Sequence, residues 1–137
     1  GVKLIADVSI DSIKSKNFDL IILHGGQPGT DNLKKDPRVI LLLKEMESNN
    51  KLIGAICAAP IILEENGILQ KRRRTSHPSI KGALSGDLYV ENRVVVDHNI
   101  ITSRSPGTAM EFAFKLVEIL YGKDRVRVVN NGVLAKI

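Results

Sequence analysis

The chain has 137 residues and a mass of 15.0 kDa, a length that suits one folded domain and is short for two. Hydrophobic residues make up 43% and charged residues 26%, which excludes an intrinsically disordered chain. No apolar run approaches the roughly 20 residues that cross a bilayer, so we expect no membrane partner. The net charge is +5, concentrated at residues 71–74 without interleaved aromatic residues. We expect a solvated loop there, and nucleic acid is not expected as a dedicated partner.

Cysteine usage favours a reducing compartment. Cys57 is the only cysteine, so no internal disulfide can form. Residues 1–7 resemble a strand and carry no secretory or transit signal. We therefore expect a cytoplasmic protein, with a nuclear or mitochondrial pool as the alternative. The absence of an initiator methionine suggests a processed or truncated protein.

The first half of the chain alternates strand-like and helix-like segments. Short apolar runs predict strands, and one of them ends in the chain-breaking run His24-Gly25-Gly26-Gln27-Pro28-Gly29. A helix is predicted from Asp36-Pro37, because a capping side chain precedes proline at the first helical position and apolar residues then recur at helical spacing. The predicted elements are strands at 2–6, 19–23 and 51–56 and helices at 36–49 and 58–65.

The second half continues this alternation and ends in helices. Thr108 and Glu111 have the spacing of a capping box at the start of the clearest helix, which Gly122 ends. The predicted elements are a short strand at 72–76, a hairpin at 88–97 turning near Glu91-Asn92, a strand at 99–103, and helices at 108–122 and 123–130. The alternation predicts an α/β fold with a parallel sheet covered by helices.

Cys57 directly follows a predicted strand and directly precedes a predicted helix, in Gly54-Ala55-Ile56-Cys57-Ala58-Ala59-Pro60. This position is typical of a nucleophile elbow, where small neighbours make room for a pinched backbone. Backbone N–H groups and the positive end of the helix dipole favour a thiolate there. The alternative is that Cys57 is a small buried hydrophobic residue, the more common role of a lone cysteine.

Two further features favour a catalytic cysteine. Gly25 and Gly26 follow another predicted strand, and glycines let backbone N–H groups approach a ligand, so that with the N–H of Ala58 they form a candidate oxyanion hole. His77 follows the predicted strand 72–76, where a histidine can act as acid–base partner of the thiolate. The alternative is that His77, which precedes proline, is a turn residue.

Several segments, taken in order, form a specific combination. They are Phe18-Asp19-Leu20-Ile21-Ile22-Leu23-His24-Gly25-Gly26, Ala55-Ile56-Cys57-Ala58-Ala59-Pro60, Thr75-Ser76-His77-Pro78, Glu91-Asn92-Arg93-Val94 and Thr102-Ser103-Arg104-Ser105-Pro106-Gly107-Thr108. Together they resemble the ThiJ/PfpI family and, within it, the parkinsonism-associated deglycase branch. The resemblance implies one α/β domain over residues 1–137, with a flavodoxin-like, doubly wound, mostly parallel sheet, helices on both faces and a small β-hairpin. It also implies a homodimer.

The resemblance assigns roles to residues of this chain. It makes Cys57 the nucleophile, which oxidises readily to a sulfinate, and His77 the proton shuttle. It makes Gly26 and Ala58, with Gly25 beside them, the oxyanion donors.

Arg104 would line the same pocket, where its guanidinium could hold a small carboxylate or carbonyl oxygen. The alternative is a surface arginine before a helix. No cofactor is implied. His24 stands where relatives usually have proline, and no close ligand spacing joins it to Cys57 and His77, so no metal site is expected.

The family begins with a strand, a helix whose acidic residue hydrogen-bonds the cysteine thiolate, and a further strand, and nothing in this chain matches them. We therefore expect a longer native protein, or a separate polypeptide that supplies this strand-helix-strand segment. Without that carboxyl group, Cys57 would lack the partner that tunes it.

The function expected from the resemblance is that of a cysteine-dependent, cofactor-independent glyoxalase or deglycase. Its substrates would be methylglyoxal-type 2-oxoaldehydes, or their adducts on proteins or nucleotides, and its product a 2-hydroxy acid. One alternative is a redox-sensing stress chaperone that responds through oxidation of Cys57. A further alternative is a cysteine peptidase, which the short chain disfavours.

Overall fold

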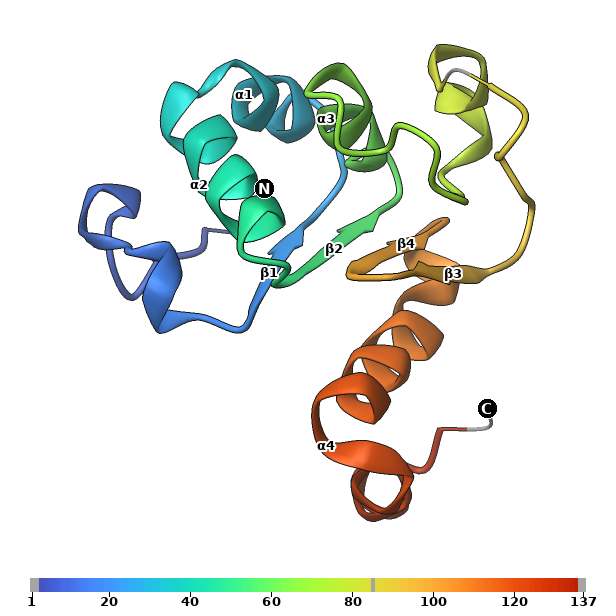
Figure 1. Ribbon diagram of the computed structural model, residues 1–137. Helices are drawn as coiled ribbons and strands as arrows, with labels where there is room; N and C mark the ends of the chain where they lie inside the picture. Colours follow the sequence, from blue (N-terminus) through green and yellow to red (C-terminus); the bar gives the residue numbers. More distant parts are fainter. Residues whose placement is uncertain (1–2, 85, 136–137) are drawn as a thin grey trace.

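The computed structural model describes residues 3–84 and 86–135, which form a four-stranded sheet with helices on both sides (Figure 1). The strands are β1 (Leu20–Leu23), β2 (Leu52–Ile56), β3 (Val94–Asp97) and β4 (Ile100–Ser103). The α-helices are α1 (Gly29–Lys35), α2 (Pro37–Ser48), α3 (Pro60–Glu65) and α4 (Ala109–Val133). Short 3₁₀ helices are η1 (Ile10–Ser12), η2 (Ser15–Asn17), η3 (Pro78–Ala83) and η4 (Pro106–Thr108).

The sheet has the strand order β1-β2-β4-β3. β1, β2 and β4 run parallel, and β3 runs antiparallel to β4 at one edge. The outer edge of β1 has no strand partner within the part of the chain that the structure describes. The α/β class with a mostly parallel sheet, which the sequence predicts, is confirmed.

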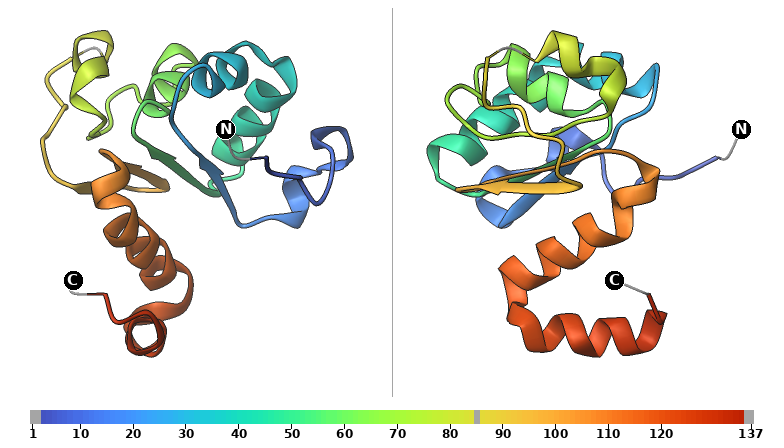
Figure 2. Two further views of the ribbon diagram at one scale, coloured as in Figure 1. Left: turned by 180° about the vertical axis from the view of Figure 1, so that it is seen from behind. Right: turned by 90° about the vertical axis from the view of Figure 1, so that its right-hand side faces the viewer.

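Helices cover the two faces of the sheet unequally. In the side view, α1, α2 and α3 lie on one face and α4 on the other (Figure 2). The larger core lies under α1, α2 and α3, and its fully buried members include Leu43, Met46, Ile53, Ile62, Leu63 and Leu69. The smaller core on the other face consists of Ile101, Phe112 and Leu116, with partly buried neighbours from the strands.

The start of α2 follows from its local sequence. The carboxylate of Asp36 accepts a hydrogen bond from the backbone N–H of Arg38 at 2.9 Å, and Pro37 occupies the first helical turn. Leu43 and Met46 then lie on the buried face. The predicted helix at 36–49 is therefore confirmed, together with its cap.

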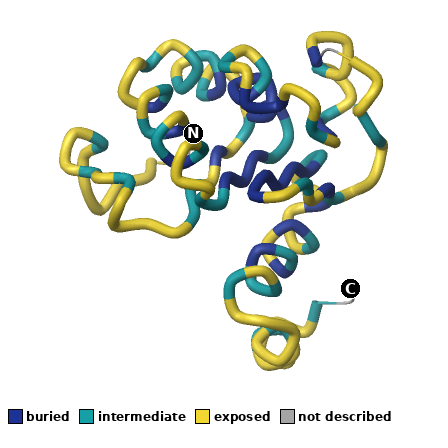
Figure 3. The backbone as a smooth tube through the Cα atoms, viewed as in Figure 1, coloured by how far each residue is buried: buried dark blue, intermediate teal, exposed yellow. Residues whose placement is uncertain are grey.

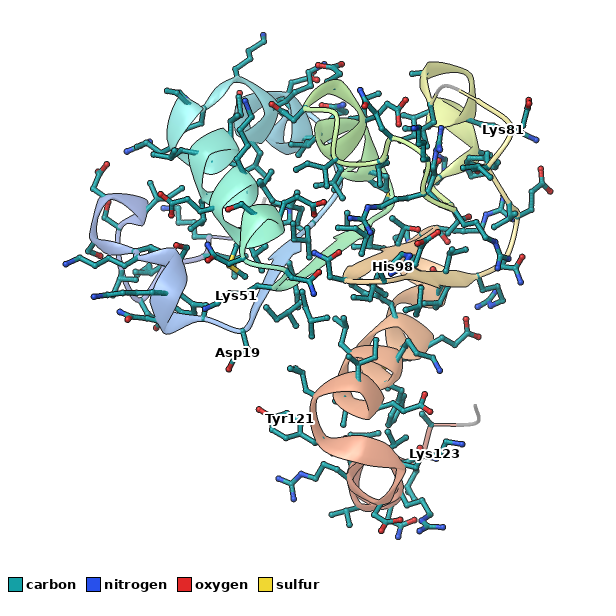
Figure 4. All side chains as sticks on the ribbon, viewed as in Figure 1. Asp19, Lys51, Lys81, His98, Tyr121 and Lys123 are labelled. Carbon is teal, nitrogen blue, oxygen red and sulfur yellow. The ribbon has the colours of Figure 1, made fainter. Side chains whose placement is uncertain are left out.

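The amino ends of β1 and β2 lie on the opposite side of the sheet from their carboxyl ends, where Cys57 follows β2. Figure 4 shows Asp19 and Lys51 together at this end, just before β1 and β2. The ammonium group of Lys51 donates to the backbone carbonyl of Ser15 at 3.0 Å, which holds η2 against the start of β2.

The predicted strand at 2–6 is wrong over its described part. Residues 3–6 have no regular structure, and Leu4 and Ile5 are 89% and 98% exposed. An apolar run becomes a strand only where a neighbouring strand supplies hydrogen bonds, and none pairs with these residues. Val2 lies outside the described residues.

The structure has a β-hairpin, but it is formed by residues 94–103. The predicted location at 88–97, with a turn near Glu91-Asn92, is therefore wrong. β3 pairs with β4 instead, through a turn at His98 and Asn99. His98 has a φ of 52°, the left-handed conformation typical of tight hairpin turns. The predicted strand at 72–76 is reduced to an isolated bridge between Arg74 and Tyr89.

The basic run at 71–74 is only partly a solvated loop. Lys71 and Arg73 are exposed, whereas Arg74 is 3% exposed, which corrects the expectation from composition. The guanidinium of Arg74 donates to the carbonyl of Arg72 at 2.9 Å and lies 3.8 Å from the carboxylate of Glu64. This buried charge is accommodated because carbonyl and carboxylate oxygens replace water around it.

The predicted capping box of Thr108 and Glu111 is wrong. The hydroxyl of Thr108 accepts hydrogen bonds from the backbone N–H groups of Arg104 and Ser105, at 3.1 and 3.0 Å, and so caps η4. Glu111 instead pairs with Arg93, whose Nε lies 2.6 Å from its carboxylate. The side chains therefore connect α4 to β3 and η4 rather than capping α4 itself.

α4 breaks at Gly122, as the sequence predicts. Gly122 has a φ of 83°, which glycine adopts readily because it lacks a Cβ. Tyr121 and Lys123 flank this break, and the helical stretch beyond it is largely exposed (Figures 3 and 4). No helix among residues 3–84 and 86–135 is long and apolar enough to span a membrane.

Burial of α2 predicts a contrast between two neighbouring leucines. Leu43 is fully buried, so Leu43→Ala should lower the free energy of unfolding by about 2–5 kcal/mol, measured by urea denaturation. Leu41 is 60% exposed on the same helix, and Leu41→Ala should change it by about 0.5 kcal/mol or less. Equal losses in the two variants would contradict the packing of α2 described above.

Candidate active site

Cys57 forms the sharp turn between β2 and α3. Its φ is 66°, in the left-handed region that residues other than glycine rarely adopt. β2 ends at Ile56 and α3 begins at Pro60, so the turn is completed within a few residues. This strand-turn-helix geometry with an unusual backbone conformation is that of a nucleophile elbow.

Two hydrogen bonds hold the backbone of Cys57. Its N–H donates to the carbonyl of Ser103 at 3.1 Å, which extends the β2–β4 ladder one residue beyond Ile56. Its carbonyl accepts the N–H of His77 at 2.9 Å. The thiol is free, and the residue is half-buried rather than part of the apolar core, which argues against a purely structural role.

The loop after β1 packs against the elbow at Gly25. A Cβ on Gly25 would lie 2.7 Å from the backbone nitrogen of Ala58 and 2.7 Å from the Cβ of Cys57. Contacts this short do not occur, so only glycine lets the two segments meet. The structure brings together the backbones of Gly25 and Ala58, both of which the sequence predicts for an oxyanion hole.

Gly26 lies next to this contact with its own backbone fixed. The carbonyl of Gly26 accepts hydrogen bonds from both the N–H and the hydroxyl of Thr30, at 2.8 and 2.9 Å. Within residues 3–84 and 86–135, the N–H groups of Gly26 and Ala58 have no hydrogen-bond acceptor. Both amides are therefore available to donate to an oxygen bound beside the elbow.

His77 is the N-cap of η3, directly before Pro78, and is half-buried. Its Nδ1 accepts a hydrogen bond from the backbone N–H of Ser79 at 3.2 Å and lies 2.8 Å from the hydroxyl of Ser79. The hydrogen bond from its N–H to Cys57 ties the backbones of the two residues together. The structure thus brings His77 to the cysteine through the main chain, with the ring attached to η3.

Arg104 follows β4 directly, and its guanidinium donates to the backbone carbonyl of Glu91 at 2.9 Å. The ammonium group of Lys81, which is labelled in Figure 4, lies 2.8 Å from the carboxylate of Glu91 and forms an ion pair with it. The hydrogen bond from Lys81, assisted by the charge of Arg104, lowers the pKa of Glu91. Arg104 therefore anchors the segment before β3, and the structure gives its side chain no bond to Cys57 or His77 within the described residues.

Two hydroxyl side chains that the sequence motifs do not point to fix this arrangement. Thr30 is fully buried and holds Gly26, while Ser79 holds the ring of His77. A threonine shortly after a Gly-Gly turn and a serine shortly after His-Pro are typical local backbone-bonding positions, and these were the available signals.

No group of three or more histidine, cysteine, aspartate or glutamate side chains is arranged to hold a metal ion within residues 3–84 and 86–135. His24 is exposed, and its Nδ1 lies 3.1 Å from the carbonyl of Gly25. A cavity of about 220 Å³ beside β1 and α2 is lined by apolar residues, including Phe18, Ile21 and Met46. Cys57 is not among them, so this cavity is separate from the candidate site.

These features define a class of protein: a flavodoxin-like α/β domain with a cysteine elbow, free backbone amides and a histidine at the carboxyl end of a parallel sheet. The family model described as the DJ-1/PfpI family matches residues 1–119. The chain belongs to the DJ-1/PfpI family, which confirms the resemblance seen in the sequence.

Individual relatives agree with this assignment. Protein DJ-1 homolog A of Arabidopsis thaliana is 41% identical over 133 residues, which are 96% of this chain and 34% of that protein. Glutathione-independent glyoxalase DJR-1.2 of Caenorhabditis elegans is 41% identical over 127 residues, covering 91% of this chain and 67% of that protein. The crystal structure of Drosophila melanogaster DJ-1beta superposes with a TM-score of 0.94 at 41% identity, over 99% of this chain and 74% of that one. The chain thus spans about a third of the length of the Arabidopsis relative.

The contact at Gly25 predicts that a single methyl group will disturb the elbow. Gly25→Ala places a Cβ against Ala58 and Cys57, so the rate of Cys57 alkylation by iodoacetamide should change by about tenfold. The single cysteine makes this rate readable from intact mass. Gly82→Ala is the matched control, because a Cβ on Gly82 meets nothing within 4 Å, and it should alkylate like the unmodified chain. Equal rates in all three proteins would refute the close approach at Gly25.

Proposed function

We propose that this chain carries the catalytic cysteine of a glyoxalase or deglycase that acts on 2-oxoaldehydes such as methylglyoxal, or on their protein or nucleotide adducts. The observation that carries the proposal is the elbow: a half-buried Cys57 in a left-handed turn beside the free amides of Gly26 and Ala58. The similarity to a relative named a glutathione-independent glyoxalase supports the same reaction class.

The first step is addition of sulfur to the aldehyde. The thiolate of Cys57 forms a bond to the aldehyde carbon, and the carbonyl π pair moves to oxygen. The N–H groups of Gly26 and Ala58 donate to this oxygen as its charge develops. Protonation of the oxygen gives a hemithioacetal.

The second stage is an internal redox change that needs no cofactor. A proton leaves the former aldehyde carbon and is delivered to the neighbouring carbon, while the hydroxyl proton of the hemithioacetal passes to the oxygen on that neighbouring carbon. The first carbon is thereby oxidised to a thioester and the second reduced to a secondary alcohol. Water then cleaves the thioester, which regenerates the thiol and releases lactate. His77 is the proposed carrier of the proton between the two oxygens, and an acidic residue of the kind that the resemblance implies is the proposed carrier of the carbon-bound proton.

The test is turnover of methylglyoxal by the full-length protein, followed as lactate. Cys57→Ala should abolish lactate formation, because the proposed thioester forms on the sulfur of Cys57. His77→Gln should lower kcat by about 10²- to 10⁴-fold, the usual contribution of a general acid–base group. Leu41→Ala serves as the control and should retain full activity, since this side chain is exposed on α2. Undiminished lactate formation by Cys57→Ala would overturn the proposal.

A second candidate function uses the same sulfur as a peroxide sensor. Cys57 is half-buried, so peroxide can reach it, and no second cysteine in this chain can capture its sulfenic acid as an internal disulfide. Oxidation would then proceed to the sulfinate, which adds a negative charge at the elbow.

Mild peroxide treatment followed by peptide mass spectrometry tests this function. The peptide that contains Cys57 should gain two oxygen atoms, while peptides containing Met46 and Met110 should remain unmodified under the same conditions. Modification of the methionines before Cys57 would argue against a sensor role.

A further inference from the structure

We propose that Ser79 is a positioning residue that holds His77 in the tautomer with its proton on Nε2, so that His77 offers a hydrogen-bond donor to the carbonyl oxygen of a substrate at Cys57. This inference rests on the proposed function for its catalytic consequence. The assignment of the tautomer depends only on the contacts between Ser79 and His77.

The backbone of Ser79 decides which ring nitrogen carries the proton. An amide N–H can only donate, and that of Ser79 is 3.2 Å from Nδ1 of His77 with hydrogen-bond geometry. Nδ1 must therefore present its lone pair. In the neutral ring the remaining nitrogen, Nε2, then carries the proton.

The hydroxyl of Ser79 strengthens this preference. Its Oγ lies 2.8 Å from Nδ1, closer than the backbone nitrogen, and a rotating O–H can donate to the same lone pair. Ser79 is near the start of η3, where an N–H has no acceptor within the helix, so the imidazole also caps that helix. Both donors of one residue therefore converge on one nitrogen.

Nε2 is left as the ring nitrogen available to a ligand. Within the part of the chain that the structure describes, Nε2 has no hydrogen-bond partner. The hydrogen bond from the backbone N–H of His77 to the carbonyl of Cys57 fixes the backbone of His77 next to the elbow. A ring anchored through Nδ1 and carrying its proton on Nε2 is preorganised to donate.

This tautomer changes the part that His77 plays in the addition step. A neutral imidazole with a protonated Nε2 polarises a carbonyl, the role described for the neutral histidine of triosephosphate isomerase. While the sulfur–carbon bond forms and the π pair moves to oxygen, the Nε2–H donates to that oxygen and the proton stays on the ring. His77 then has no lone pair on Nε2 with which to take the thiol proton, so Cys57 must enter the step as a thiolate.

Ring ¹⁵N NMR of the full chain, at a pH where the histidines are neutral, reads the tautomer directly. His77 should show a protonated Nε2 and an unprotonated Nδ1, with its signals identified by their loss in His77→Gln. Ser79→Ala removes the hydroxyl but keeps the backbone N–H, and should raise the population with a protonated Nδ1 several-fold. Ser79→Thr restores the hydroxyl and should restore the original spectrum.

A protonated Nδ1 in the unmodified chain would overturn the assignment of the tautomer, and identical ring spectra in Ser79→Ala and the unmodified chain would overturn the contribution of the Ser79 hydroxyl. For methylglyoxal turnover, Ser79→Ala should lower kcat/KM by about fivefold, as expected for loss of one hydrogen bond, and Ser79→Thr should recover it. A shifted tautomer with unchanged kcat/KM would overturn the catalytic consequence. If the unmodified chain shows the expected tautomer but makes no lactate, the proposed function fails while the positioning by Ser79 stands.

Discussion

The left-handed backbone of Cys57 is the constraint on which the candidate site depends. A residue other than glycine in this conformation costs about 1–3 kcal/mol and persists only where its surroundings hold it. Here the backbone N–H of Cys57 donates to the carbonyl of Ser103, and the carbonyl of Cys57 accepts the N–H of His77. Gly25 packs against the elbow as well, because no larger residue fits at this position. The strain is therefore held by residues from three separate parts of the sequence.

Parallel pairing explains why these parts meet. β1, β2 and β4 all end at the same edge of the sheet, so the loops that follow them come together there. The β1 loop brings glycine amides, β2 brings the sulfur, and β4 brings the carbonyl that holds the cysteine N–H. The sheet thus positions the loops, and the loops carry the groups that form the candidate site.

Local chemistry allowed much of this arrangement to be predicted from the sequence. The elbow was predictable because small residues surround a cysteine between an apolar run and a helix start, and α2 because Asp36-Pro37 is a self-contained signal. The position of the hairpin could not be predicted, because residues 94–97 have the pattern of a strand whichever neighbour they pair with. Their pairing with β4 depends on the arrangement of the whole sheet. Composition also predicted a solvated loop at Arg74, which is buried instead. Its burial depends on oxygens supplied by Leu69, Arg72 and Glu64.

The positions of hydroxyl groups explain the remaining gap between sequence and site. Thr30, Ser79 and Thr108 each bond to a backbone or ring atom a few residues away, yet a sequence contains many serines and threonines with no such role. Only the fold shows which of them face a functional group. In this site they fix a carbonyl, an imidazole and the turn after β4, and so determine how rigidly the elbow's neighbours are held.

Direct observation of the first covalent species tests the central claim most sharply. ¹³C NMR of the full-length protein with methylglyoxal labelled at the aldehyde carbon should show a hemithioacetal on Cys57 as one dominant diastereomer, because the amides of Gly26 and Ala58 hold its oxygen on one side. An ordinary surface thiol would give both diastereomers in comparable amounts. Two equal signals, or a signal that survives in Cys57→Ser, would contradict an elbow built to stabilise the oxyanion.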